Sequence, residues 1–193
     1  MPLANEHGVA IFVNNKKNKG WAGHTLERYL KLPLNSSRTP NFGSWELKST
    51  SLKYRKDGQL VVKETIAITM LDPVEVLQKE FEESHLYTKL RKTLLVARIH
   101  ESQQEERSIL HSIAAFDLDD IRLVKALKAD YELIREAVRN GEKLSGALGR
   151  FIQPRTKGAG HGSTSRAFYA RKELVAHLLN ITPIKFIDDI VES

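Results

Sequence analysis

The sequence contains no cysteine, so it forms no disulfide bond and no thiolate zinc site, a composition that suits a reducing cytoplasm. No apolar run is long enough to cross a bilayer, and we find no secretory signal peptide. Repeats of solenoid period and low-complexity tracts are also missing. These absences predict a cytoplasmic protein with no membrane partner. The length of 193 residues is sufficient for one domain with its own hydrophobic core.

Positive charge is in excess. The formal net charge of +6 favours a polyanionic partner, although an ordinary basic soluble protein can carry the same charge. The distribution of the charge is more informative than its total, because residues 150–172 contain no acidic residue and have glycines interleaved with the basic ones. Such a segment is typical of contact with phosphate groups. Its basic residues are Arg150, Arg155, Lys157, Arg166, Arg171 and Lys172.

Hydrophobic spacing predicts helices in four parts of the chain. The first begins at Trp21 with Asn18 as its cap, and one or two short helices follow over residues 72–92. The longest helix extends over 117–141, and the last one covers 170–180.

Strands are expected between these helices. Residues 45–70 predict a β-hairpin that turns at 57–58, and two short apolar runs at 93–99 and 108–116 predict buried strands. Residues 151–169 read as a strand, a glycine-rich loop and a second strand. This order of helices and strands predicts one mixed α/β domain.

Glu46 and Lys48 are separated by one residue on a predicted strand, so their side chains point to the same face. A carboxylate binds Mg²⁺, and the carbonyl of Leu47 between them can supply another oxygen. A neighbouring ammonium can orient or deprotonate the attacking water, or neutralise charge on phosphorus, as metal-assisted phosphodiester hydrolysis requires. An exposed strand face with alternating charge would present the same pair, so the pair alone leaves both interpretations open.

Four segments in order resemble the MutH family of DNA endonucleases, which includes restriction enzymes that cut at GATC. "KGWAGHTLERYL" resembles the first active-site helix of the family, and "NFGSWELKS" is similar to its metal-binding strand. "SHLYTKL" resembles the segment with a second lysine. "FIQPRTKGAG" followed by "SRAFYARKEL" is similar to the DNA-recognition region, and "FIDDIV" resembles the connector after the nuclease domain in two-domain members.

The resemblance implies a restriction-endonuclease-like fold, an α/β fold with a mixed sheet and flanking helices. Residues 1–180 would form one nuclease domain, and 181–193 a C-terminal tail or connector. The implied activity is that of a type II restriction-like deoxyribonuclease, a sequence-specific endonuclease that hydrolyses phosphodiester bonds of double-stranded DNA at a GATC-type site. Its cofactor would be Mg²⁺, with Mn²⁺ as a substitute. Dimer formation on DNA and the exact recognition site are left open.

The resemblance also implies roles for individual residues. Glu46 would be a metal carboxylate and Lys48 the catalytic lysine. Glu27 would be a supporting carboxylate on a helix, and Lys89 a second lysine that faces the scissile phosphate. The residues implied to contact DNA are Arg155, Lys157, Arg166 and Tyr169.

Asn41 departs from the family pattern, which has an aspartate at this position as a metal ligand. An asparagine offers a carbonyl oxygen without charge, so Mg²⁺ affinity is expected to fall. Three explanations compete: a variant that traps an uncut complex, a nuclease with weakened metal binding, or a catalytically silent, sequence-specific DNA-binding module of the same fold. The other expected active-site residues, Glu27, Glu46, Lys48 and Lys89, are all present, which favours a nuclease framework with one inactivating or attenuating change.

Overall fold

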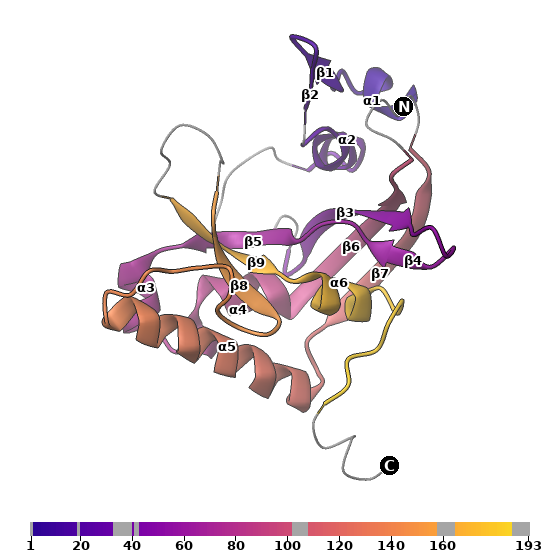
Figure 1. The fold of residues 1–193 in the computed structure, drawn as a ribbon. Helices are drawn as coiled ribbons and strands as arrows, with labels where there is room; N and C mark the ends of the chain where they lie inside the picture. Colours follow the sequence, from indigo (N-terminus) through magenta and orange to yellow (C-terminus); the bar gives the residue numbers. More distant parts are fainter. Residues whose placement is uncertain are drawn as a thin grey trace.

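The computed structural model describes residues 2–18, 20–32, 40, 43–101, 108–157 and 165–186. Two β-sheets form the middle of the molecule (Figure 1). A small N-terminal unit, residues 2–18 and 20–29, lies on one side of them, and the long helix α5 (Ile121–Arg139) lies on the opposite side. The predicted mixed α/β class, with a mixed sheet and flanking helices, is confirmed. None of the described helices is long and apolar enough to cross a membrane.

The first sheet has the strand order β4 (Leu60–Val62), β3 (Glu46–Tyr54), β6 (Lys92–Ile99) and β7 (Leu110–Asp117). β3 and β6 run parallel, with Glu46 opposite Thr93, whereas the other neighbours are antiparallel. Parallel neighbours need a long crossover connection, and both strands begin at the same end of the sheet. The segment that leads into β6 therefore returns to the end of the sheet where Glu46 lies.

The second sheet is antiparallel and places β9 (Arg166–Ala170) between β5 (Ile66–Leu71) and β8 (Ile152–Thr156). The two strands predicted within residues 151–169 are thus confirmed. The glycine-rich residues 158–164 between them lie outside the described part of the chain.

Capping side chains explain where several helices begin. Asp72, Ser84 and Asp120 each accept a hydrogen bond from a backbone N–H in the first turn of the helix that follows. One or two short helices were predicted over 72–92, and the structure has two; the long helix and the last helix are also confirmed. The remaining elements are α1 (Pro2–Glu6), β1 (Phe12–Val13), β2 (Lys16–Lys17), α2 (Trp21–Tyr29), α3 (Pro73–Gln78), the 3₁₀ turn η1 (Phe81–Glu83), α4 (His85–Arg91) and α6 (Lys172–Leu178).

The main hydrophobic core lies between the two sheets and the helices α3 to α6, whereas a second, small cluster belongs to the N-terminal unit. The small cluster consists of Ala4, Val9, Ile11 and Trp21. Ile184 and Phe186 are buried in the main core, so the first part of the predicted tail packs on the domain. The boundary at residue 180 stays a prediction.

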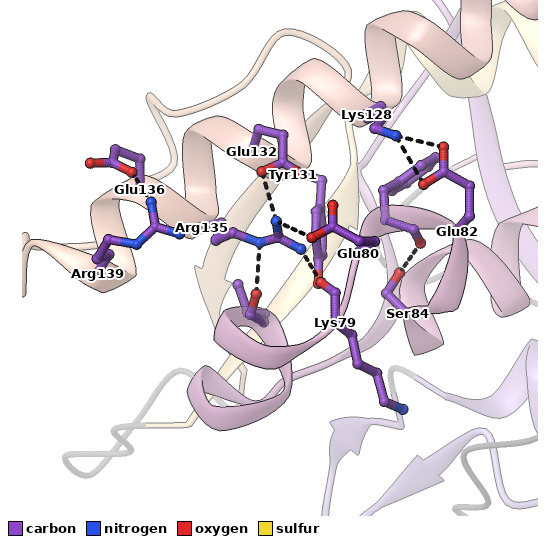
Figure 2. Close-up of polar contacts among 12 residues, drawn as sticks. Lys79, Glu80, Glu82, Ser84, Lys128, Tyr131, Glu132, Arg135, Glu136 and Arg139 are labelled. Carbon is purple, nitrogen blue, oxygen red and sulfur yellow. Dashed lines mark hydrogen bonds and ion pairs between the residues drawn. The ribbon is translucent and has the colours of Figure 1, made fainter.

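Arg135 ties the segment that follows α3 to α5 (Figure 2). Its Nε donates a hydrogen bond to the carbonyl of Val76 at 2.9 Å, and its Nη2 donates to the carbonyl of Lys79. The hydroxyl of Tyr131 donates to the same Lys79 carbonyl at 3.0 Å. Nη1 of Arg135 lies 3.1 Å from a carboxylate oxygen of Glu80. The chain is thereby held in place just before it enters η1 and α4.

Two strand predictions need correction. The hairpin predicted over residues 45–70 forms only between β3 and β4, with Gly58 in the turn at φ +82°. The continuation becomes β5 and pairs with β9, because its buried side chains, Ile68 and Leu71, belong to the core at the second sheet. The second predicted buried strand, β7, lies at the edge of its sheet and exposes Leu110 and Ile113, because only β6 pairs with it among the described strands.

The predicted cap of the first helix is also wrong. The residue that precedes α2 is Gly20, and no side chain caps the helix. Asn18 instead accepts a hydrogen bond from the N–H of Gly20 and donates one to the carbonyl of Ala10, both at 3.1 Å. The side chain of Asn18 therefore shapes the loop before the helix, which is a common use of asparagine in turns.

Candidate active site

Glu46, Lys48 and Lys89 come together at the end of the first sheet where β3 and β6 begin. Nζ of Lys48 lies 2.7 Å from Oε1 of Glu46, and Nζ of Lys89 lies 2.8 Å from Oε2. The side chain of Glu46 is 3% exposed and that of Lys89 is 8% exposed, whereas the side chain of Lys48 is 23% exposed. A buried carboxylate needs ionic or hydrogen-bonding partners to remain charged, and here each oxygen has its own ammonium partner.

The sheet register explains this meeting. Glu46 and Lys48 alternate along β3 and therefore share one face of the sheet. Lys89 is in the last turn of α4, and α4 leads directly into β6, whose second residue is opposite Glu46. The hydroxyl of Thr93 donates to the carbonyl of Lys89 at 3.2 Å, which fixes the junction between helix and strand.

The start of α4 is held by a second contact. Glu75 on α3 accepts a hydrogen bond from the backbone N–H of His85 at 2.9 Å, and its other oxygen lies 2.6 Å from Nδ1 of that residue. Burial alone would raise the pKa of Glu75, but the hydrogen bonds and charge of His85 outweigh this effect and hold the pKa below its usual value. Together with Arg135, this contact positions the helix that carries Lys89.

Lys48 has a perturbed pKa. Burial lowers the pKa of its ammonium, and the ion pair with Glu46 offsets only part of this effect. The positive charges of Lys89 and Lys157 lower it further. A lysine with a lowered pKa can more readily give up its proton and serve as a base.

The residues present fit a metal that is only partly held by protein. Within the described ranges, no group of three or more His, Cys, Asp or Glu side chains could hold a metal ion. Mg²⁺ is often bound through one or two carboxylates together with phosphate oxygens and water, and Glu46 can supply one carboxylate. Leu47, whose carbonyl is the second expected ligand, is buried on β3. Asn41 lies outside the described residues.

Glu27 belongs to a different element, α2. It is half-buried on α2, which packs over the face of the first sheet that carries Ser49 and Val96. Because side chains alternate along a strand, Glu46 and Lys48 point to the opposite face. Among the described residues, no hydrogen bond or ion pair joins Glu27 to the two lysines or to Glu46, and its supporting role stays a prediction.

The residues expected to contact DNA lie on the hairpin of β8 and β9. Nη1 of Arg155 donates to Oγ1 of Thr65 at 2.8 Å, and its guanidinium lies 5.5 Å from the centroid of the Tyr169 ring. Arg166 donates to the hydroxyl of Thr156 across the hairpin. Lys157, at the end of β8, is close enough to Lys48 to influence its charge state. We refer to β8 and β9 together as the recognition hairpin, after the DNA-reading role expected for it.

Sequence reasoning missed Asp130, which anchors this hairpin. Asp130 is buried on α5, and its carboxylate accepts hydrogen bonds from the backbone N–H groups of Arg150, Phe151 and Ile152 at 2.6, 2.6 and 2.8 Å. A signal was present, because Asp130 lies within the apolar stripe of the long helix, where an unpaired carboxylate would be costly. Thr65 was missed as well, and nothing in its local sequence indicates its contact with Arg155.

Comparisons with known proteins indicate which family this chain resembles. The family model described as DNA mismatch repair enzyme MutH matches residues 30–134, more than half of the chain and the part that contains Glu46, Lys48 and Lys89. The DNA mismatch repair protein MutH of Haemophilus influenzae (strain ATCC 51907) is 26% identical over 197 residues, which cover 92% of this chain and 86% of that protein. Proteins of the same name from Vibrio campbellii and Shewanella woodyi are also 26% identical, over 86% of this chain and 74% and 71% of their own lengths.

Proposed function

The chain belongs to the MutH family of DNA mismatch repair enzymes, and from this premise we propose that it is an endonuclease that hydrolyses phosphodiester bonds of double-stranded DNA. The observation that carries the proposal is the buried Glu46 with Lys48 and Lys89 on its two oxygens. Metal-assisted phosphodiester hydrolysis uses a carboxylate to hold the metal ion and a cation close to the phosphate, and these side chains can supply both.

Mg²⁺ is the proposed cofactor, with Mn²⁺ as its substitute. Glu46, the carbonyl of Leu47 and the side-chain oxygen of Asn41 would hold it together with phosphate oxygens and water. When bound, the ion supplies positive charge that polarises the phosphodiester and activates water. Since Asn41 brings no charge, the proposed affinity for the metal is lower than that of a site with two carboxylates.

The lysines would divide the remaining work. Lys48, whose pKa is lowered by burial, would take a proton from the attacking water or neutralise charge on phosphorus. Lys89 is nearly buried and tied to Glu46, and it would keep this carboxylate in place and face the scissile phosphate. Attack of water on phosphorus would leave a 5′-phosphate and a 3′-hydroxyl.

The recognition hairpin would supply sequence specificity. Arg155, Lys157, Arg166 and Tyr169 are the proposed DNA-contacting residues, and a GATC-type site is the proposed target. The relatives named above are mismatch repair proteins, so nicking in repair is one proposed role, and type II restriction cleavage of both strands, alone or as a dimer on DNA, is the other. The products separate the two, because nicked and linear plasmid run at different positions in a gel.

The test is incubation of supercoiled plasmid containing GATC with the protein, first with Mg²⁺ and then with Mn²⁺. We expect nicked or linear DNA, and we expect Lys48→Ala to reduce its formation by at least about 100-fold, the lower end of typical general-base contributions. Lys53→Ala is the matched control, because Lys53 is an exposed lysine at the far end of the same strand. Circular dichroism of each variant checks that the fold is kept.

A second candidate function is the catalytically silent, sequence-specific DNA-binding module, which Asn41 favours because it removes an expected charged ligand. If neither metal supports cleavage while a GATC duplex is still bound in preference to a scrambled one, this second function is the correct one. Equal cleavage by the parent and Lys48→Ala would instead reject the role proposed for Lys48.

A further inference from the structure

Arg155 is held from two sides. Its Nη1 donates to the hydroxyl of Thr65 at 2.8 Å, and its guanidinium lies over the ring of Tyr169, 5.5 Å from the centroid. Thr65 and Tyr169 are half-buried, whereas Arg155 itself is exposed. Long exposed arginines ordinarily sample many rotamers, so contacts at both the edge and the face of the guanidinium restrict its orientation.

The second sheet brings the three residues together. Arg155 is on β8 opposite Ala167, and Tyr169 is two residues further along the middle strand β9. Because the spacing of two keeps both side chains on one face, Arg155 reaches diagonally over Tyr169. Thr65 immediately precedes β5, the strand on the other side of β9, so the arginine spans the whole width of this small sheet.

The contact leaves the guanidinium suited to reading a base. A guanidinium has five N–H donors in a fixed plane, and Thr65 engages one of them. Two further donors can form the bidentate pair with O6 and N7 of a guanine, which requires the plane to be aimed correctly. A hydroxyl that fixes the plane before DNA binds therefore reduces the loss of entropy on specific binding.

We propose that Thr65 is a specificity-determining positioning residue whose hydroxyl aims Arg155 at a guanine edge. This inference rests on the proposed function, because it presumes that the hairpin reads DNA. A hydrogen bond that only stabilised the sheet would have a different effect. Its loss would lower the stability of the protein and weaken the binding of all DNA sequences alike.

The experiment measures binding without added divalent metal, so that the DNA stays intact. The probe is a pool of duplexes with randomised central positions, sequenced before and after selection, together with a GATC duplex and a scrambled one. For Thr65→Val, we expect the preference for guanine at one position to fall about 5-fold or more, while affinity for the scrambled duplex and its salt dependence stay unchanged.

Three further variants make the result specific. Thr65→Ser keeps the hydroxyl and should restore the preference. Thr69→Val makes the same substitution on β5, at a hydroxyl without a hydrogen bond to any described residue, and should leave the preference unchanged. In an Arg155→Ala background, Thr65→Val should cause no additional loss, because Thr65 acts through Arg155.

Two results overturn the inference in distinguishable ways. If the parent selects no sequence and binds both duplexes equally, the proposed sequence specificity fails and the role of Thr65 fails with it. If the parent prefers a site and Thr65→Val retains this preference, or weakens the two duplexes in parallel, only the role of Thr65 is rejected.

Discussion

Glu46 is a single carboxylate shared by two lysines from different elements, and this sharing sets the chemistry of the candidate site. Both of its oxygens are occupied at 2.7 and 2.8 Å, and the residue is almost completely buried. Removing one partner of such a buried pair leaves an uncompensated charge, which typically costs several kcal/mol, on the order of 3–5. A metal ion that approaches Glu46 has to replace part of the interaction that the ammonium groups now provide. The charge of any additional ligand is therefore important.

Asn41→Asp is the residue-scale prediction. A carboxylate at position 41 would add a full negative charge to the proposed metal site, so we expect Mg²⁺-dependent plasmid cleavage to increase at least about tenfold, with half-maximal activity at a lower Mg²⁺ concentration. Titration of Mg²⁺ in the cleavage assay measures both quantities.

Asn140→Asp is the control for Asn41→Asp, because it makes the same change in charge at the C-terminal end of α5. It should leave the metal titration as it is. If Asn41→Asp cuts no better than the parent at saturating metal, position 41 is not a metal ligand.

At the scale of elements, the recognition hairpin depends on a helix that contributes none of its proposed DNA contacts. Asp130 of α5 accepts three backbone hydrogen bonds from residues 150–152, where β8 begins. On the other side of the hairpin base, Nε of Arg171 donates to the carbonyl of Gly149 at 3.0 Å. Gly149 has φ +75°, a conformation that suits glycine and lets the chain turn sharply into the strand. The two ends of the hairpin are thus fixed by side chains of opposite charge.

Asp130→Asn is the element-scale prediction. An amide keeps one acceptor oxygen but loses the charge and directs N–H groups at backbone donors, so we expect the free energy of unfolding to fall by about 2 kcal/mol or more. Urea unfolding measures this loss. Hydrogen exchange should accelerate at the amides of Phe151 and Ile152 in particular.

Asp119→Asn, at an exposed aspartate just before the same helix, serves as the comparison and should change stability by less than about 0.5 kcal/mol. Equal effects of Asp119→Asn and Asp130→Asn would show that the three hydrogen bonds of Asp130 contribute little.

For the whole molecule, the question is which face receives the DNA. The net charge of +6 is spread over the chain and does not by itself select a face. Lys157 follows β8, and its positive charge helps to lower the pKa of Lys48, so we expect the end of β8 and the candidate catalytic group to face the same DNA. The turn between β3 and β4 carries exposed basic residues too, but it lies at the opposite end of β3 from Glu46.

The salt dependence of binding gives the whole-molecule prediction. Each phosphate neutralised by the protein contributes about −0.9 to the slope of log affinity against log salt. We expect Lys157→Ala to make the slope less steep by about one such unit on a scrambled duplex, and Lys56→Ala, in the turn between β3 and β4, to leave it unchanged. Fluorescence anisotropy over a salt series gives the slopes. If Lys56→Ala changed the slope and Lys157→Ala did not, the DNA would instead bind at the end of the molecule that carries the turn between β3 and β4.

The hydrophobic pattern of single segments was sufficient to predict much of the fold. Periodicity placed the long helix and the strands β6, β8 and β9, because spacing along the chain directly reflects which side chains face the core. It missed the separation of β4 from β5, since a strand of given pattern can pair with either of two sheets. It also missed the exposure of β7, because an apolar run does not reveal whether a neighbouring strand lies on each side.

Residue types and short spacings were enough to place Glu46 and Lys48 on one face, and the order of four motifs was enough to indicate the family. The contact of Lys89 with Glu46, 43 residues away, exists only because parallel pairing brings the start of β6 beside the start of β3. The contacts of Asp130 with the base of β8 and of Thr65 with Arg155 likewise join residues far apart in the chain. Such contacts depend on strand order, register and the paths of connecting segments, which the side-chain pattern of a single segment does not specify.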